Sequence, residues 1–176
     1  MKQLRINFDE IQKAMEDISR DSFDYFFDTE TGEVITFSEE ILNEVKSRLY
    51  ESDSEEIDED VECMEYDEEP DIPYWMEDEV ELAMEILFDT KGRYARIPER
   101  ASSAAFQVMT EYIDTVEDPE LRRLLAASVE GKGAFRRFKD VLIEYAKERK
   151  RWHGCNAKAA RKEIAQWLLS IGIEPV

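Results

Sequence analysis

The chain has 176 residues, 43% of them apolar and 38% charged, and a formal net charge of −20. This length allows one domain with a sizeable core, and no apolar run approaches the roughly 18–20 residues of a membrane helix. The net charge disfavours nucleic acid and anionic membranes, and it favours basic partners.

The charge is unevenly distributed along the chain. Residues 1–90 contain 31 acidic and 6 basic side chains, whereas residues 131–176 contain 5 acidic and 11 basic side chains. This asymmetry allows the two ends to attract each other, within one chain or between copies. The two cysteines, Cys63 and Cys155, form no disulfide framework, and the first residues lack the apolar core of a signal peptide. We therefore expect a cytoplasmic protein.

The first 50 residues predict a helix, a β-hairpin and a second helix. Helical spacing predicts the first helix over residues 7–20, and its apolar face consists of Phe8, Ile11, Met15 and Ile18. Two β-rich runs, 22–28 and 33–37, are joined by a short loop that contains a glycine, which is typical of a hairpin. Ser38 then caps a helix that continues to about residue 50.

Residues 51–71 hold 13 acidic side chains and no basic one, which predicts a self-repelling loop or linker. Because the segment contains no glycine, it lacks the sharp turn of an EF-hand calcium loop. Its acids form a candidate docking surface for a basic partner protein, and the candidate residues are Glu55, Glu56, Asp58, Glu59 and Asp60.

The remaining chain predicts one more strand and mainly helices. A helix over 76–88 is followed by a strand over 92–98, which can join the hairpin in a three-stranded antiparallel sheet. From residue 102 onward the pattern predicts helices only, over 103–116, 118–131, 133–147 and 156–170.

The expected fold is therefore α+β and mostly helical, with a small antiparallel sheet packed by helices and an all-helical C-terminal half. We expect one compact domain, made of residues 1–50, an acidic loop or linker over 51–73, and residues 74–176.

Residues 131–140 are the leading candidate for a ligand site. Two glycines before a helix, with a lysine beside them, can present backbone N–H groups to a phosphate, although the spacing is not that of a Walker loop. The candidate anion-binding residues are Lys132, Gly133, Arg136, Arg137 and Lys139. Two alternatives remain: a tight turn between two helices, and arginines that pair with acids of the first half.

No catalytic or metal-binding set can be selected from the sequence. His153 and Cys155 lie two residues apart, but a thiol nucleophile needs a positioned base, and two ligands fall short of a tetrahedral zinc site. We expect this pair at a junction between helices, and we expect no catalytic residue, metal or cofactor. Residues 149–152 contain three basic side chains and Trp152, and they resemble a small nucleic-acid contact. Trp152 itself is expected in the core.

Several segments carry a family resemblance: residues 7–15, 27–34, 94–98, 106–113, 121–142 and 163–173. The most specific run is Gly133-Ala134-Phe135-Arg136-Arg137-Phe138. Together they resemble a bacterial family of uncharacterised proteins, number 0158 in the UPF series. The resemblance implies a self-contained bacterial cytosolic domain, and it implies no activity.

We expect a non-enzymatic binding or regulatory protein that acts through charged surfaces on a basic protein partner. The alternative is binding of phosphate, a nucleotide or a nucleic acid such as RNA through residues 131–139.

Overall fold

A computed structural model describes residues 1–53 and 74–176. It divides the chain into two compact units: Met1–Glu16 with Pro98–Val176, here called the helical unit, and Asp17–Ile97, here called the sheet unit. The charge separates with them, because the helical unit's sequence has 17 basic and 15 acidic side chains, whereas the sheet unit's has 6 basic and 28 acidic. The division predicted at residues 50 and 74, and the prediction of one domain, stay predictions.

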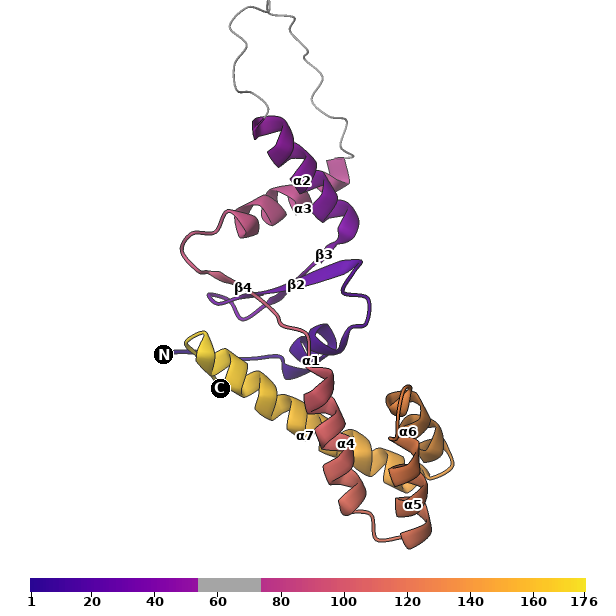
Figure 1. Ribbon diagram of the computed structural model, residues 1–176. Helices are drawn as coiled ribbons and strands as arrows, with labels where there is room; N and C mark the ends of the chain where they lie inside the picture. The colour runs from indigo at the N-terminus through magenta and orange to yellow at the C-terminus, as the bar shows by residue number, and fades with distance from the viewer. Residues whose placement is uncertain (54–73) are drawn as a thin grey trace, which may run out of the picture. The chain divides into compact units, whose positions relative to one another are not determined.

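The sheet unit contains three antiparallel strands in the order β3-β2-β4 (Figure 1). The strands are β2 (Phe23–Asp28), β3 (Val34–Ser38) and β4 (Tyr94–Arg96). Phe26 in the central strand pairs with Ile35 on one side and with Arg96 on the other. The predicted three-stranded sheet, and with it the α+β class, is confirmed.

Two helices cover one face of this sheet. They are α2 (Glu39–Asp53) and α3 (Tyr74–Leu87). Ser38 caps α2 as predicted, since its Oγ accepts a hydrogen bond from the backbone N–H of Ile41 at 3.4 Å. The shared core consists of Phe26, Phe37, Ile41, Val45, Met76, Val80, Ala83 and Ile86. Burial of these apolar side chains holds the two helices to the strands.

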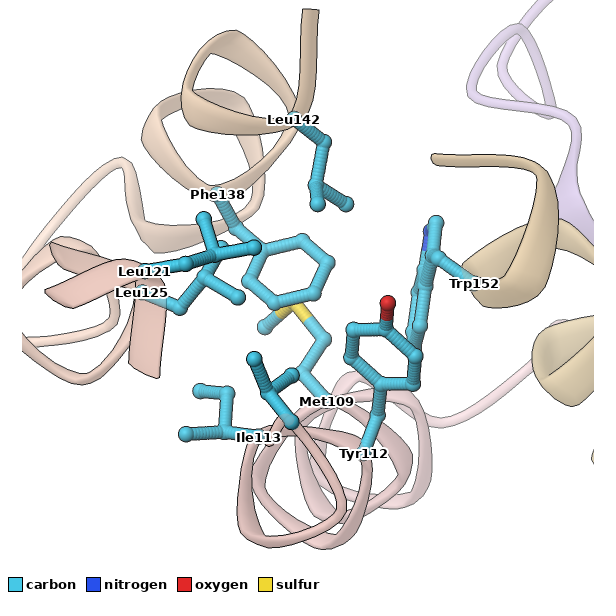
Figure 2. Packing of buried hydrophobic residues seen from close by; sticks show 9 residues of the cluster. Met109, Tyr112, Ile113, Leu121, Leu125, Phe138, Leu142 and Trp152 are labelled. Atoms are coloured by element: carbon cyan, nitrogen blue, oxygen red, sulfur yellow. The ribbon is translucent and has the colours of Figure 1, made fainter. Parts of the chain in front are cut away.

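The helical unit contains the other five helices of the described chain. They are α1 (Phe8–Glu16), α4 (Ser102–Asp114), α5 (Pro119–Ser128), α6 (Ala134–Ile143) and α7 (Ala146–Ser170). Helices α4 to α7 enclose a core in which Tyr112, Phe138 and Trp152 meet edge to face (Figure 2). The closest pair, Phe138 and Trp152, has ring centroids 4.8 Å apart, a favourable geometry for aromatic rings.

A short parallel pair of strands joins the two ends of the chain. β1 (Lys2–Leu4) pairs with β5 (Ile173–Pro175), so that both termini lie side by side within the helical unit. Three-residue strands are too short to show an alternating pattern, which explains why the sequence analysis missed this pair.

Helix α1 ends at Glu16 rather than at residue 20. The Asp17 carboxylate accepts hydrogen bonds from the Ser19 N–H at 2.8 Å and from the Tyr25 hydroxyl, which turns the chain out of the helix. As a consequence Ile18, expected on the apolar face of the helix, is 98% exposed.

The last two helices also divide differently from the prediction. α6 ends at Ile143, and α7 runs without interruption from Ala146 to Ser170, so the expected junction at His153 and Cys155 is wrong. Buried side chains repeat every four residues along the later part of α7, at Ala160, Ile164 and Leu168. Trp152 lies on the same spacing, and this continuous packed row stabilises one helix where the local sequence indicated a break.

Candidate functional site

The sheet unit has a pocket of about 410 Å³ between the end of α3, the loop that follows β2 and the start of β4. Its lining residues are Thr29, Glu30, Glu85, Phe88, Asp89, Thr90, Lys91, Gly92, Arg93 and Tyr94. Small-molecule sites are usually lined mainly by apolar side chains. Because this lining is mostly charged or hydroxyl-bearing, the pocket suits a charged group better than an apolar ligand.

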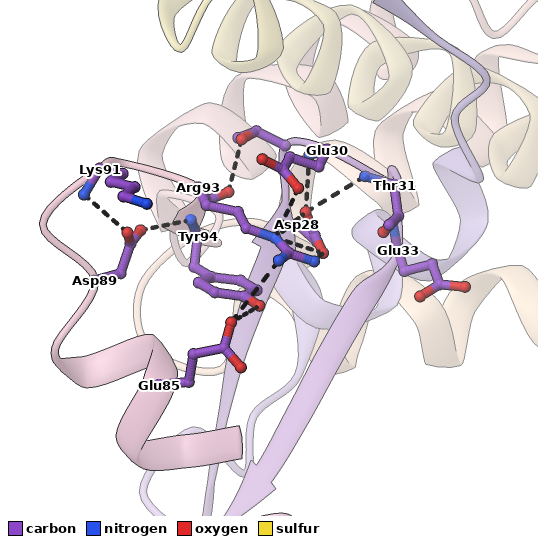
Figure 3. A network of polar contacts seen from close by, with 10 residues as sticks. Asp28, Glu30, Thr31, Glu33, Glu85, Asp89, Lys91, Arg93 and Tyr94 are labelled. Carbon is purple, nitrogen blue, oxygen red and sulfur yellow. Dashed lines mark hydrogen bonds and ion pairs between the residues drawn. The ribbon is translucent and has the colours of Figure 1, made fainter. Parts of the chain in front are cut away.

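An ion pair joins Asp28 to Arg93, one of the residues that line the pocket (Figure 3). The Asp28 side chain is only 5% exposed, and it accepts hydrogen bonds from the N–H groups of Glu30 and Thr31 at 2.7 and 3.3 Å. Burial alone would raise the pKa of Asp28, but the hydrogen bonds from Arg93 and the two amides together lower it. Asp28 is therefore a fixed anion that anchors the hairpin loop.

Arg93 is surrounded by two further carboxylates (Figure 3). Its guanidinium lies 3.4 Å from Glu30 and 3.8 Å from Glu85, and the Tyr94 hydroxyl donates to Glu85 at 2.9 Å. Burial, and next this hydrogen bond to Glu85, raise the pKa of Tyr94. One guanidinium cannot neutralise three carboxylates, so the exposed pair Glu30 and Glu85 gives the pocket a negative rim.

The loop between α3 and β4 is held by Asp89. Its carboxylate accepts hydrogen bonds from the N–H groups of Lys91 and Tyr94, both at 2.9 Å. The bond from the Tyr94 N–H contributes most to lowering the pKa of Asp89. Gly92 completes the turn with a left-handed φ of +74°. The pocket edge is thus a defined loop rather than an open connection.

An acidic stripe on α3 leads to this pocket. The helix contains no basic residue, and its exposed side carries the α3 acidic face, defined as Glu77, Asp78, Glu81 and Glu85. The opposite side of the helix carries the buried core residues. Tyr74 and Phe88 are exposed at the two ends of the stripe, and both Glu85 and Phe88 line the pocket.

The structure places the predicted anion-binding residues at the turn between α5 and α6. Gly131 and Gly133 both adopt left-handed φ, at +74° and +77°. The Arg136 side chain is 90% exposed and lies 3.9 Å from Asp140, one helical turn further on. Lys132 and Lys139 are also exposed. The structure therefore contains the predicted tight turn, and the side chains of Lys132, Arg136 and Lys139 are exposed beside it.

Unlike Arg136, Arg137 contacts the backbone of the turn between α5 and α6. Its guanidinium donates to three backbone carbonyls of the turn, those of Ser128 (3.0 Å), Glu130 and Lys132. These carbonyls follow the end of α5, where orphan acceptors need partners. The partners of Arg136 and Arg137 thus come from residues 128–140, and Arg137 is already engaged in holding the turn.

The other candidates selected from the sequence are residues of α7 and the acids of residues 55–60. His153 and Cys155 are exposed on α7, whereas Trp152 is buried against Phe138, as expected for a core residue. Arg151 donates to the Thr115 hydroxyl at 2.6 Å and lies over the Tyr112 ring. The acidic docking candidates Glu55, Glu56, Asp58, Glu59 and Asp60 lie outside the described residues. Their role and that of the anion candidates stay predictions.

Sequence reasoning did not find the Asp28–Arg93 pair, because 65 positions separate the two residues. A usable signal was present in the hairpin, where Asp28 precedes the loop that contains Gly32, since aspartate often accepts hydrogen bonds from N–H groups two residues on.

Residues 1–53 and 74–176 contain no group of three His, Cys, Asp or Glu side chains placed to hold a metal ion. Within the same ranges, none of the helices has both the length and the apolar character needed to cross a membrane.

The fold and its surfaces define a mostly helical α+β protein in which an acidic unit and a weakly basic unit share one chain. A family model described as an uncharacterised protein family (UPF0158) matches residues 71–176, and the chain belongs to this family. The predicted resemblance is thereby confirmed. No curated protein and no solved structure matches the chain.

Proposed function

We propose that this protein is a non-enzymatic, cytoplasmic binding protein that docks a basic segment of a partner protein on the α3 acidic face and in the adjoining pocket. One observation carries the proposal. The exposed side of α3 presents acids over about two and a half turns without a single basic residue, and it ends at a pocket with two exposed carboxylates.

The arrangement is unfavourable for the isolated helix, which supports a binding role. Like charges four residues apart, such as Glu77 with Glu81 and Glu81 with Glu85, destabilise a helix by about 0.2–0.5 kcal/mol per pair. Glu85 also lies near the negative end of the helix dipole. A basic partner segment would relieve both costs, and the acidic charge of the sheet unit would accelerate the encounter.

Exposed aromatic side chains add to the proposed surface. Tyr74, Trp75 and Phe88 are exposed at the two ends of α3. Tyrosine and tryptophan are enriched among the residues that dominate binding energy at interfaces, and aromatic rings attract the cationic groups of lysine and arginine. A partner segment with lysine or arginine side chains along one side of a helix or of an extended strand can contact both the α3 acids and these aromatic rings.

The pKa directions favour binding over catalysis at this site. A carboxylic acid that donates a proton near neutral pH needs a raised pKa. In Asp28 and Asp89 the pKa is lowered instead, because both carboxylates accept several hydrogen bonds. Such groups hold structure and attract cations, and they are poor proton donors.

The proposal is tested with synthetic lysine-rich peptides without arginine, each paired with a version in which every lysine is acetylated. Binding is measured to the wild type and to Glu77→Gln/Asp78→Asn/Glu81→Gln. We expect the variant to bind at least about tenfold more weakly, a loss of about 1.4 kcal/mol, and the acetylated peptides to bind weakly to both proteins.

The matched control is Glu33→Gln/Glu39→Gln/Glu40→Gln, which removes the same charge from other exposed positions of the sheet unit. It should stay within about threefold of wild type, because screening limits distant charges to about 10 Å at 0.1 M salt. Equal losses in both variants would mean that the acidity acts diffusely, and the α3 surface would then be rejected.

Binding of phosphate, a nucleotide or RNA through residues 131–139 is the second candidate. It is supported by the first turn of α6, which follows the N-cap residue Gly133 and has no side-chain cap, and by the exposed Lys132, Arg136 and Lys139. Since Arg137 holds the turn, the informative variant is Lys132→Gln/Lys139→Gln, titrated with a nucleotide panel and an RNA pool. Unchanged binding would remove this candidate.

A further inference from the structure

A row of exposed lysines on α7 has no role in the function proposed above. The α7 basic face is defined as Lys147, Lys150, Lys158 and Lys162, all of which are exposed. Spacings of three, eight and four residues keep them on one side of the helix. In the part of the chain that the structure describes, none of these lysines forms an ion pair.

The acids of α7 do not neutralise this face. Glu148 accepts a hydrogen bond from the Tyr112 hydroxyl at 2.7 Å and pairs with Arg151 at 3.1 Å. Glu163 accepts two hydrogen bonds from Arg100, both at 2.9 Å. Because the two carboxylates of the 25-residue helix are engaged with Tyr112, Arg151 and Arg100, neither of them forms an ion pair with a lysine of this face.

The position of these lysines costs the helix stability. Lys147 and Lys150 lie in the first turns of α7, where the helix dipole disfavours cations. Lys158 and Lys162 are a like-charge pair four residues apart, which is unfavourable by a few tenths of a kcal/mol. Local conflicts of this kind tend to occur where a protein performs its function.

Gly154 lies in the middle of the same face, four residues from both Lys150 and Lys158. A glycine inside a helix costs about 1 kcal/mol relative to alanine. No packing reason is found here, because a Cβ added at Gly154 meets no atom within 4 Å and its φ is not left-handed. What the missing side chain does provide is a bare stretch of helix that a ligand backbone can approach closely.

We infer that the α7 basic face binds the phosphate backbone of a nucleic-acid duplex, with Gly154 at the point of closest approach. Lys147 and Lys162 are 15 residues apart, so the face is about 22 Å long at 1.5 Å per residue, which spans about six base pairs of a duplex at 3.4 Å of helix axis per base pair.

A duplex fits this face better than a single strand. Binding of single strands relies on aromatic side chains that stack on successive bases. Of the two aromatic rings within the span of these lysines, Trp152 is buried in the core and only the His153 imidazole is exposed, which does not provide a row of stacking platforms. Contacts to phosphates alone carry no sequence information, so the expected binding is independent of sequence.

The binding is tested by fluorescence anisotropy with the full chain and labelled 16-base-pair DNA and RNA duplexes, over a series of salt concentrations around 0.1 M. At that salt, charges further away than about 10 Å are largely screened, which limits repulsion by the acidic residues. Four phosphate contacts predict a slope of about −3.6 for the logarithm of the binding constant against the logarithm of salt concentration.

Three variants separate this face from other basic surfaces. Lys150→Gln/Lys158→Gln should bind at least about tenfold more weakly, with a salt slope reduced by about 1.8. Arg5→Gln/Arg123→Gln removes the same charge from exposed positions of the same unit outside α7, and it should stay within about threefold of wild type. Gly154→Ala should bind several-fold more weakly at an unchanged slope, while its helix becomes more stable by up to about 1 kcal/mol.

Several results would overturn the inference. These are no binding of either duplex by the wild type, equal losses in Lys150→Gln/Lys158→Gln and Arg5→Gln/Arg123→Gln, or wild-type affinity in Gly154→Ala. Displacement of the duplex by polyglutamate at equal charge concentration would also overturn it, because the face would then recognise any acidic chain, such as an acidic protein.

Discussion

Arg93 meets the carboxylate of Asp28 with two hydrogen bonds from Nε, both 3.2 Å long, and one from its terminal nitrogen, 2.8 Å long. The pair joins the last residue of β2 to the residue that precedes β4. Forked contacts of this kind are the strongest that arginine makes with a carboxylate, and here they hold the edge of the pocket.

Replacement of Asp28 should destabilise the sheet unit. Asp28→Asn leaves Arg93 without its buried partner, and we expect a loss of about 2–3 kcal/mol in the free energy of unfolding, less than for a fully buried pair because Arg93 is partly exposed. Urea unfolding, with hydrogen exchange of β2 and β4 amides, measures it. The control Asp21→Asn, at an exposed position, should change little, and equal effects would contradict a special role of the pair.

Acid should weaken the same unit. The pKa values of Asp28 and Asp89 are lowered in the folded protein, so the unfolded state binds more protons near the ordinary aspartate pKa of about 3.9. The stabilisation is complete above that pH and is lost as pH falls through the lower folded pKa values. Melting temperatures between pH 7 and pH 2 should therefore fall below about pH 4, and less steeply in Asp28→Asn. Parallel curves would contradict this.

The sequence predicts the sheet well because its signals are local. Alternating β-rich runs around a glycine-containing loop specify β2 and β3, and Ser38 specifies the start of α2. The pocket could not be predicted in the same way, since Asp28 and Arg93 lie 65 positions apart and meet only through the pairing of β2 with β4.

Helix ends were the weakest part of the prediction, for physical reasons that differ between elements. Asp17 competes with α1 for backbone N–H groups and ends the helix early. In α7 the opposite happens, because packing of Trp152 and Ala160 extends the helix through Gly154, a residue that locally favours a break. Tertiary contacts decide in both cases.

Arg136 and Arg137, neighbours in the first turn of α6, should respond very differently to substitution. Arg137→Gln removes donors from three carbonyls of the turn, and we expect a loss of about 1–3 kcal/mol in the stability of the helical unit. Arg136→Gln, at a position 90% exposed, should stay within about 0.5 kcal/mol. Chemical unfolding followed by tryptophan fluorescence in a Trp75→Phe background, in which only Trp152 and Trp167 of the helical unit emit, compares them. A larger effect at Arg136 would show that the roles are reversed.

Substitutions of Gly131 and Gly133, in the turn between α5 and α6, allow the cost of backbone strain to be distinguished from the cost of steric crowding. Both have left-handed φ, but an added Cβ meets nothing within 4 Å at Gly131, whereas at Gly133 it comes 3.2 Å from the Arg137 guanidinium. Gly131→Ala should cost about 1 kcal/mol from strain alone. Gly133→Ala should cost more, because Arg137 must shift from its carbonyls. If Arg137→Gln is present first, the difference between the two glycine variants should shrink in the same unfolding assay.

Arg100 should be the most sensitive charged residue of the helical unit. Its side chain is 6% exposed and pairs with Glu16 at 2.8 Å and Glu163 at 2.9 Å, which links α1 to α7. Arg100→Gln leaves these carboxylates without a cation, and a loss of about 3 kcal/mol is expected. The exposed Arg123→Gln serves as the control. Adding Glu163→Gln to Arg100→Gln removes one stranded charge and should recover part of the loss in denaturant unfolding; additive losses would mean that the two side chains act independently.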